Sequence, residues 1–200
     1  MGFDLYGIHP KNPDNIQKPY FDWSKDHTEK ETEEYFNEVD AFETAVPGDY
    51  FRANVWGWRP LWQFVCEFCS DFLSEKDMRA GDFNDGMKIC KTKAKKIAAR
   101  IRRLRRDGTL VKYSLIKTEI YELARKHNKI IQAELEEYQN YVTDQLNDKD
   151  IVPADYPKKY KDKWRRIYAK KDWNGSYPFH LENIVDFGKF CEESGGFEIC

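Results

Sequence analysis

Three tryptophans and one arginine fall within nine consecutive residues, 54–62, which read Asn-Val-Trp-Gly-Trp-Arg-Pro-Leu-Trp. Indole rings offer large flat faces for stacking, and a guanidinium binds phosphate through paired hydrogen bonds. Trp56, Trp58 and Trp62 could therefore stack on a flat ligand such as a purine base while Arg59 contacts its phosphate. The same rings could instead form a core wedge, because buried aromatic residues usually serve packing. The sequence leaves both interpretations open.

Polar residues close to this cluster could supply further ligand contacts. Arg52 and Asn54 come directly before it, and Asp4 and Tyr6 lie near the start of the chain. We expect Arg52 to meet phosphate or ribose and the other three residues to complete the binding site. The alternative is that these groups satisfy one another's hydrogen bonds inside the fold. A cleft lined by rings and arginines needs no catalytic residue.

A purely basic stretch is the second candidate site. Residues 88–106 contain ten lysines and arginines and no acidic residue. On a helix these cations could neutralise several phosphates of a nucleic acid. The candidates for phosphate contacts are Lys95, Lys96, Arg100 and Arg103. The alternative is a solvated face that pairs with the acidic segment 26–43 of the same fold.

Motifs for metal binding and for thiol chemistry are incomplete. Asp82 and Asp85 begin a loop that resembles a calcium loop, but Lys93 stands where an EF-hand needs its twelfth-position carboxylate. The two aspartates remain weak metal candidates, and a simple turn is the alternative. Cys66 and Cys69 form a single C-x-x-C pair, for which buried thiols are the expectation. No catalytic motif is complete, so we expect a binding protein without cofactor or metal. A metal-assisted hydrolase that uses Asp82 and Asp85 is the alternative.

The hydrophobic pattern predicts the elements that position these candidates. Apolar residues at helical spacing indicate helices over 26–43, 60–73, 87–106, 111–146 and 181–193. Strand signals are confined to 49–55 and 197–200, and residues 1–23 read as irregular. We expect a single, mainly α domain across 1–200, with α+β as the alternative class. We expect this domain to have an aromatic core and at most a small sheet, built from the two strand segments. We also expect the acidic helix to lie beside the basic helix.

Composition limits the compartment and the partners. Aromatic residues make up 16% of the chain, charged residues 34%, and the mean hydropathy is -0.83. No apolar run approaches the roughly 20 residues of a membrane helix, and the first residues lack the basic and apolar regions of a secretory signal. Five cysteines are an odd and sparse set. We therefore expect a reduced, cytoplasmic protein with no membrane contact.

Several segments resemble a family of small proteins encoded by tailed bacteriophages. The likeness rests on 1–7 (MGFDLYG), 50–62 (YFRANVWGWRPLW), 81–86 (GDFNDG), 177–179 (YPF) and 194–200 (SGGFEIC). Relative to that family, residues 14–46 look like an acidic helical insertion. Some members carry cysteine pairs before the C-terminal segment, but residues 128–172 contain no cysteine here. A zinc site is therefore not carried over.

The resemblance implies an accessory protein that acts in the cytoplasm of an infected bacterium. Small phage proteins of this kind often act on host defence systems that signal with modified nucleotides. We therefore expect a counter-defence protein that binds and sequesters a nucleotide-derived small molecule in the aromatic and arginine cleft. The alternative is an interaction protein that inhibits a host enzyme, such as a defence protein, or binds nucleic acid through 88–106. A symmetric homodimer is the default oligomeric state.

Overall fold

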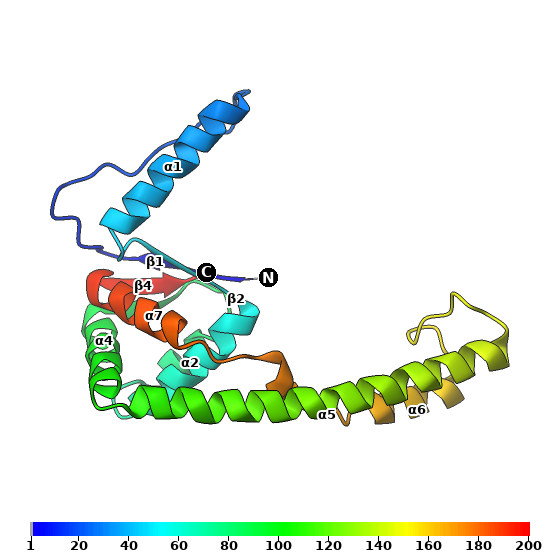
Figure 1. The fold of residues 1–200 in the computed structure, drawn as a ribbon. Helices are drawn as coiled ribbons and strands as arrows, with labels where there is room; N and C mark the ends of the chain where they lie inside the picture. The colour runs from blue at the N-terminus through cyan, green and yellow to red at the C-terminus, as the bar shows by residue number, and fades with distance from the viewer. Residues whose placement is uncertain (1) are drawn as a thin grey trace. The chain divides into compact units, whose positions relative to one another are not determined.

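The computed structural model describes residues 2–200, so that Met1 of the MGFDLYG segment lies outside the described residues. It contains four strands, seven α-helices and one short 3-10 helix (Figure 1). Their bounds are β1 (Gly2–Gly7), α1 (Glu29–Ala45), β2 (Tyr50–Asn54), α2 (Val55–Cys69), α3 (Glu75–Ala80), β3 (Met87–Cys90), α4 (Lys91–Arg106), α5 (Thr109–Leu146), α6 (Lys158–Tyr168), η1 (Trp173–Ser176), α7 (Leu181–Glu193) and β4 (Gly196–Ile199). The mainly α class with a small sheet, expected from the sequence, is confirmed.

Two compact units make up the chain, where the sequence predicted one domain over 1–200. The first unit is Met1–Tyr113 with Phe179–Cys200, and the second is Ser114–Pro178. The boundary falls inside α5, a helix of 38 residues. A helix of that length spans about 57 Å, more than the core of a small domain can cover. The rest of α5 therefore packs with α6 in a core of its own.

The sheet of the first unit contains two strands that the sequence analysis missed. All pairs are antiparallel, and the strand order is β2-β1-β4-β3. The segment read as irregular contains β1, in which Phe3 and Leu5 are buried in alternation. The helix expected from residue 87 is preceded by β3, which buries Ile89. Because β1 lies between β2 and β4, the two strands found from the sequence do not pair with each other.

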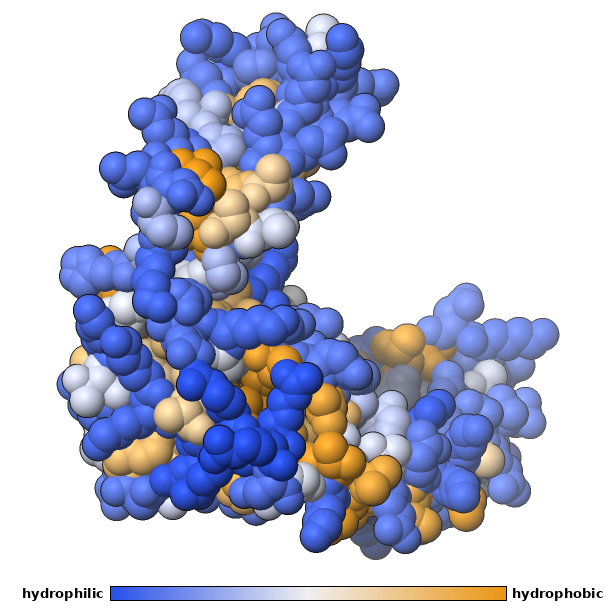
Figure 2. Space-filling view, turned by 60° about the vertical axis from the view of Figure 1, so that its left-hand side comes forward, coloured by the Kyte–Doolittle hydropathy of each residue, from blue (hydrophilic) through white to orange (hydrophobic). Residues whose placement is uncertain are grey.

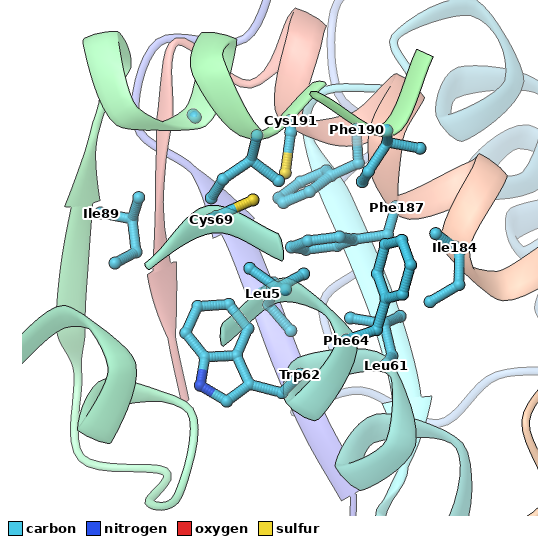
Figure 3. Close-up of a cluster of buried hydrophobic side chains, with 14 of the residues drawn as sticks. Leu5, Leu61, Trp62, Phe64, Cys69, Ile89, Ile184, Phe187, Phe190 and Cys191 are labelled. Carbon is cyan, nitrogen blue, oxygen red and sulfur yellow. The ribbon is translucent and has the colours of Figure 1, made fainter. Parts of the chain in front are cut away.

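Helices α2, α4 and α7 pack on the sheet and close the main core (Figure 1). Phe187 and Phe190 of α7 lie among residues of α2 and of the sheet, close to Cys69 and Leu5 (Figure 3). The helices α4 and α7 approach closely at Gly188, where an added Cβ would lie 3.1 Å from Cγ2 of Ile101. The core is rich in rings, as the composition indicates.

The segment that carries the tryptophans starts its helix earlier than expected. The helix was predicted from Pro60, but α2 begins at Val55 because Asn54 caps it, accepting a hydrogen bond of 2.9 Å from the Gly57 N–H. Pro60 lies inside the helix, where it removes one backbone donor. At the other end α2 stops at Cys69 instead of reaching residue 73. The residues that follow form a turn before α3.

The acidic helix α1 lies within residues 14–46, as expected, but not in the expected partnership. A capping box of Thr28 and Glu31 starts it. Its buried residue is Phe42, and the ion pair of Lys30 with Glu34 lies within the helix itself. The salt bridges of α4 instead run to Asp71, Asp77 and Glu192. The prediction that the acidic and basic helices pair is therefore wrong, because acidic residues of α3, of α7 and of the turn before α3 take those contacts.

The second unit is a helical pair closed by a connector. Its core contains Ile131, Leu135, Tyr138 and Val142 of α5, and Ile167 of α6. The connector after α6 is fixed by Asn128, which exchanges two hydrogen bonds of 2.8 Å with the backbone of Asp172. None of the helices described over residues 2–200 is both long enough and apolar enough to cross a membrane.

Candidate functional site

Two of the three clustered tryptophans belong to the core. Trp58 is 0% exposed and Trp62 is 3% exposed, and their rings stack on each other with centroids 5.2 Å apart. Each indole N–H donates a hydrogen bond of 2.7 Å to a backbone carbonyl oxygen, Trp58 to Gly81 and Trp62 to Met78. An added Cβ at Gly81 would lie 2.2 Å from Trp62 Nε1. The expectation that these two rings stack on a ligand is corrected, because neither has a free face.

The sheet separates the predicted polar contacts from those rings. Asp4 and Arg52 are opposite each other in the β1–β2 register. Successive strand residues point to opposite faces, so both lie on the face away from the buried neighbours Phe3 and Ala53. Arg52 Nε lies 3.6 Å from Oδ1 of Asp4. These groups therefore satisfy one another on the outer face of the sheet, which was the alternative interpretation.

Tyr6 and Asn54 also have partners within the fold. The ring of Tyr6 lies on that of Tyr50, with centroids 5.4 Å apart, and the Tyr50 hydroxyl donates a hydrogen bond to Asp4. Burial and that hydrogen bond raise the pKa of Tyr50, so that it keeps its proton as a donor. Asn54 is the cap of α2. The polar residues predicted to contact a ligand are thus engaged with one another, with Tyr50 or with the start of α2.

Trp56 and Arg59 are the members of the cluster that remain at the surface. Trp56 is 50% exposed and Arg59 is exposed. The structure does not bring them together with Trp58 and Trp62 around a shared space, because helical spacing places the buried pair on the core side of α2.

The basic helix α4 presents a strongly charged outer face. Its buried residues are Ala94, Ile97, Ala98, Ile101 and Leu104, which pack against the core. Figure 2, in which the side of the molecule that carries α4 comes forward, shows strongly hydrophilic residues gathered there. Within residues 2–200, Lys95, Lys96 and Arg103 form no salt bridge, and both lysines and Arg103 are exposed. Three of the four candidate phosphate ligands of the sequence analysis are therefore exposed without a salt-bridge partner, and the fourth, Arg100, is paired with Asp71.

A cleft beside α4 brings three of the four predicted cations together. It has a volume of about 410 Å³ and is lined by Asp71, Phe72, Lys96, Ala99, Arg100 and Arg103. The α4 residues recur at intervals of three and four, which places them on one stripe of the helix. Ala99 is the small residue in that stripe, so it leaves room between the long cationic side chains. Lys95 is one position away from Lys96 and does not line the cleft.

An aromatic ring and a carboxylate complete this cleft. Lys96 Nζ lies 5.6 Å and Arg100 Cζ lies 5.4 Å from the centre of the Phe72 ring. Arg100 also donates to the Phe68 carbonyl oxygen, and its Nη2 lies 2.7 Å from Oδ2 of Asp71. The hydrogen bond from Arg100 lowers the pKa of Asp71. Arg100 is therefore held in place, while Lys96 and Arg103 keep their charges uncompensated by a salt bridge.

Within the described residues, the two aspartates are not part of a metal-binding cluster and the two cysteines do not form a disulfide. Asp82 and Asp85 are both exposed, and within residues 2–200 no group of three or more His, Cys, Asp or Glu side chains is placed to hold a metal ion. Cys66 and Cys69 are free thiols. Burial raises the pKa of Cys66 to about 11 and that of Cys69 to about 12, so both are protonated at neutral pH.

Phe72 and Asp71 are the cleft residues that the sequence analysis did not assign. Phe72 was read as part of the apolar face of a helix running to residue 73. The early end of α2 at Cys69 instead places it in a turn beside α4. Asp71 lies two residues after the Cys66–Cys69 pair. Nothing in the sequence around it indicates that its partner is Arg100, 29 residues away.

No protein-family model, no curated protein and no solved structure matches this chain in the comparisons made with known proteins.

Proposed function

We propose that the protein binds a phosphate-bearing, nucleotide-type small molecule in the α4 cleft. The observation that carries the proposal is that Lys96, Arg100 and Arg103 line one open groove of about 410 Å³, in which Lys96 and Arg100 lie over the Phe72 ring. Cavities of roughly 300–1,000 Å³ are the usual size for small-molecule ligands. Cations with an aromatic ring suit a ligand that combines phosphate with a flat base.

Electrostatics also favours an anionic ligand here. Like charges three or four residues apart on a helix destabilise it by about 0.2–0.5 kcal/mol per pair. Lys96, Arg100 and Arg103 stand at that spacing, and Asp71 compensates only one of them through a salt bridge. Cations near a helix C-terminus are favourable, which accounts for Arg103 but not for Lys96 in the middle of α4. A bound phosphate would relieve the repulsion that remains.

The proposed activity is capture without turnover. Within residues 2–200 the cleft lining contains no histidine, cysteine, serine or threonine. Sequestering a ligand needs affinity and a closely fitting surface only. The resemblance to tailed-phage proteins supports a counter-defence role, in which removal of a signalling nucleotide blocks a host immune response.

Isothermal titration calorimetry with a nucleotide panel tests this proposal. The panel contains ATP, ADP-ribose and cyclic di- and oligonucleotides, titrated into the full chain. We expect at least one ligand to bind with one site per chain, and Arg103→Glu to weaken it by about tenfold or more, because charge-assisted hydrogen bonds contribute about 1.5–3 kcal/mol. Phe72→Leu removes the ring but keeps an apolar side chain at this half-buried position, so it should weaken binding without unfolding the protein.

Lys129→Glu is the matched control for these titrations. Lys129 is an exposed lysine on α5 and forms no salt bridge within the described residues. It makes the same change in charge as Arg103→Glu, at a position outside the cleft. Equal losses in both variants would show that only general electrostatic attraction is measured, and no heat from any ligand of the panel would refute the proposed function.

Nucleic-acid binding is the second candidate, and the extent of the basic face favours it. The 16 residues of α4 span about 24 Å, and exposed cations reach beyond the cleft at Lys95 and Arg106. A nucleic acid contacting this face would show affinity that falls steeply with salt and rises with oligonucleotide length. A single nucleotide held by two or three contacts would show a shallow dependence on salt. The same calorimetry at two salt concentrations separates the candidates.

A further inference from the structure

Apolar residues form an exposed stripe on the part of α5 that belongs to the second unit. Ile116, Ile120, Leu123 and Ile130 are 57%, 39%, 59% and 69% exposed. They belong to one continuous helix, shown in green to yellow in Figure 1. The core of the second unit uses a different set of α5 residues, which begins at Ile131. The stripe is thus additional to the face that α6 covers.

The spacing of the stripe is that of a coiled coil. Ile116, Ile120, Leu123, His127 and Ile130 follow one another at intervals of four, three, four and three. This alternation places all five side chains on one seam, which a second helix covers with knobs-into-holes packing. His127 is the polar member of the seam, and its Nε2 lies 2.9 Å from the Lys170 carbonyl oxygen. Polar seam residues fix register in coiled coils at some expense of stability.

We propose that the α5 stripe is a self-association surface on which a second copy of this chain binds in antiparallel orientation. A two-fold axis between residues 121 and 122 would place Ile120 of each copy level with Leu123 of the other. The same axis would place Ile116 level with His127. The segment from Ile116 to His127 then covers its counterpart in the second copy, while Ile130 lies beyond this paired segment, and the two-fold axis closes the assembly as a symmetric dimer.

Charge complementarity selects the antiparallel second copy as the occupant. Glu119 and Lys126 flank the stripe, and neither forms a salt bridge within residues 2–200. In the antiparallel register Glu119 of each copy lies beside Lys126 of the other, so the dimer gains two opposite-charge pairs. In a parallel coiled coil the corresponding neighbours would be Ala124 and Ile131, which carry no charge.

The area of the exposed α5 stripe limits the affinity expected for the dimer. Stable interfaces bury about 800 Å² on each partner, and four exposed residues fall short of that. We therefore expect a reversible dimer with a dissociation constant on the order of tens of micromolar. This association is independent of the α4 cleft, so either proposal can fail without the other.

Sedimentation equilibrium of the full chain over a concentration series tests the proposal. Wild type should pass from monomer to dimer, and Leu123→Asp should remain monomeric. Leu115→Asp is the matched control, because Leu115 is 67% exposed on the same helix but lies off the stripe. It should dimerise like wild type. A wild-type chain that stays monomeric at about 1 mM, or equal disruption by Leu115→Asp and Leu123→Asp, would overturn the proposal.

A charge swap tests the orientation. Glu119→Lys and Lys126→Glu should each weaken the dimer severalfold, because each places like charges side by side. The double variant Glu119→Lys/Lys126→Glu restores opposite charges across the axis and should recover most of the wild-type affinity. Circular dichroism of each variant should show unchanged helix content. A double variant as weak as the single variants would overturn the antiparallel register.

Discussion

Nη2 of Arg100 lies 2.7 Å from Oδ2 of Asp71, and the arginine is the less exposed partner, at 20% against 61%. Because Arg100 also donates to a backbone carbonyl oxygen, its guanidinium is held in the α4 cleft. The hydrogen bond from Arg100 lowers the pKa of Asp71, which therefore stays a carboxylate at neutral pH. The cleft thus contains one fixed negative charge that competes with an anionic ligand.

Replacing that carboxylate should strengthen ligand binding. In Asp71→Asn the cleft loses its negative charge while Arg100 keeps its bond to the Phe68 carbonyl oxygen. We expect roughly threefold to tenfold tighter binding of the nucleotide identified by calorimetry. Asp186→Asn, which removes a carboxylate paired with Lys189 on α7, is the control and should leave the affinity unchanged. Weaker binding by Asp71→Asn would contradict the proposed cleft.

The tryptophans should differ sharply in their effect on stability. Trp58→Ala removes a fully buried ring and leaves the Gly81 carbonyl oxygen without its donor. We expect it to lower the free energy of unfolding by about 3–5 kcal/mol. Trp56→Ala, on the exposed side of α2, should lower it by about 1 kcal/mol or less. Urea unfolding followed by circular dichroism measures both, and similar losses would contradict the assignment of Trp58 to the core.

Buried thiols should make the protein less stable at high pH. The ordinary thiol pKa of 9.0 rises to about 11 at Cys66 and about 12 at Cys69 because of burial. Above pH 9 the unfolded chain therefore loses thiol protons that the folded chain retains, and this favours unfolding. The thiol contribution is fully present below pH 9 and is lost as the pH rises toward 11–12, at up to about 1.4 kcal/mol per pH unit for each thiol.

Urea unfolding at pH 7.5, 9 and 10 measures this decline. Cys69→Ala removes one of the titrating groups, so its stability should fall less steeply with pH than that of wild type. An identical slope in both proteins would show that the Cys69 thiol does not contribute.

The Asp77 carboxylate on α3 should stabilise the fold through its ion pair with Lys93 on α4. Burial acts to raise its pKa, but hydrogen bonds from Lys93 and Ser74 outweigh burial and lower it. Its Oδ2 lies 2.6 Å from Lys93 Nζ. We expect Asp77→Asn to lower the free energy of unfolding by about 1–3 kcal/mol at pH 7. The lowered pKa contributes its full stabilisation above the ordinary carboxyl value of 3.8 and loses it as the pH falls from there through the folded-state pKa, so the difference from wild type should shrink over that range.

Much of the helical framework could be predicted from hydrophobic periodicity. The helix over 181–193 has the predicted bounds, and α5 starts two residues before the predicted 111–146 segment. The missed strand β3 has four residues, which show too few alternations to be told from a helix start. The missed strand β1 has six residues, but the prolines at positions 10, 13 and 19 made the whole of 1–23 read as irregular. The α2 boundary was misplaced because Pro60 was read as a start signal, whereas Asn54 supplies the cap.

The candidate site was predicted only in part, for a physical reason. The cationic stripe of α4 is periodic in sequence, so Lys96, Arg100 and Arg103 could be assigned to one helix face. Phe72 and Asp71 reach that face through a turn, and no local pattern encodes such a tertiary contact. For the tryptophans, composition alone could not distinguish packing from binding, because an indole ring suits both.

Nuclear magnetic resonance of the six tryptophan indole N–H groups together with the arginine side chains tests the central claim most directly. On addition of the nucleotide that binds best, we predict that the Arg100 and Arg103 signals shift and that the ring signals of Phe72 shift with them. The Trp56 indole signal should stay in place. A shift of Trp56 with unchanged α4 signals would contradict the account, because the ligand would then bind at the tryptophan segment and not in the α4 cleft.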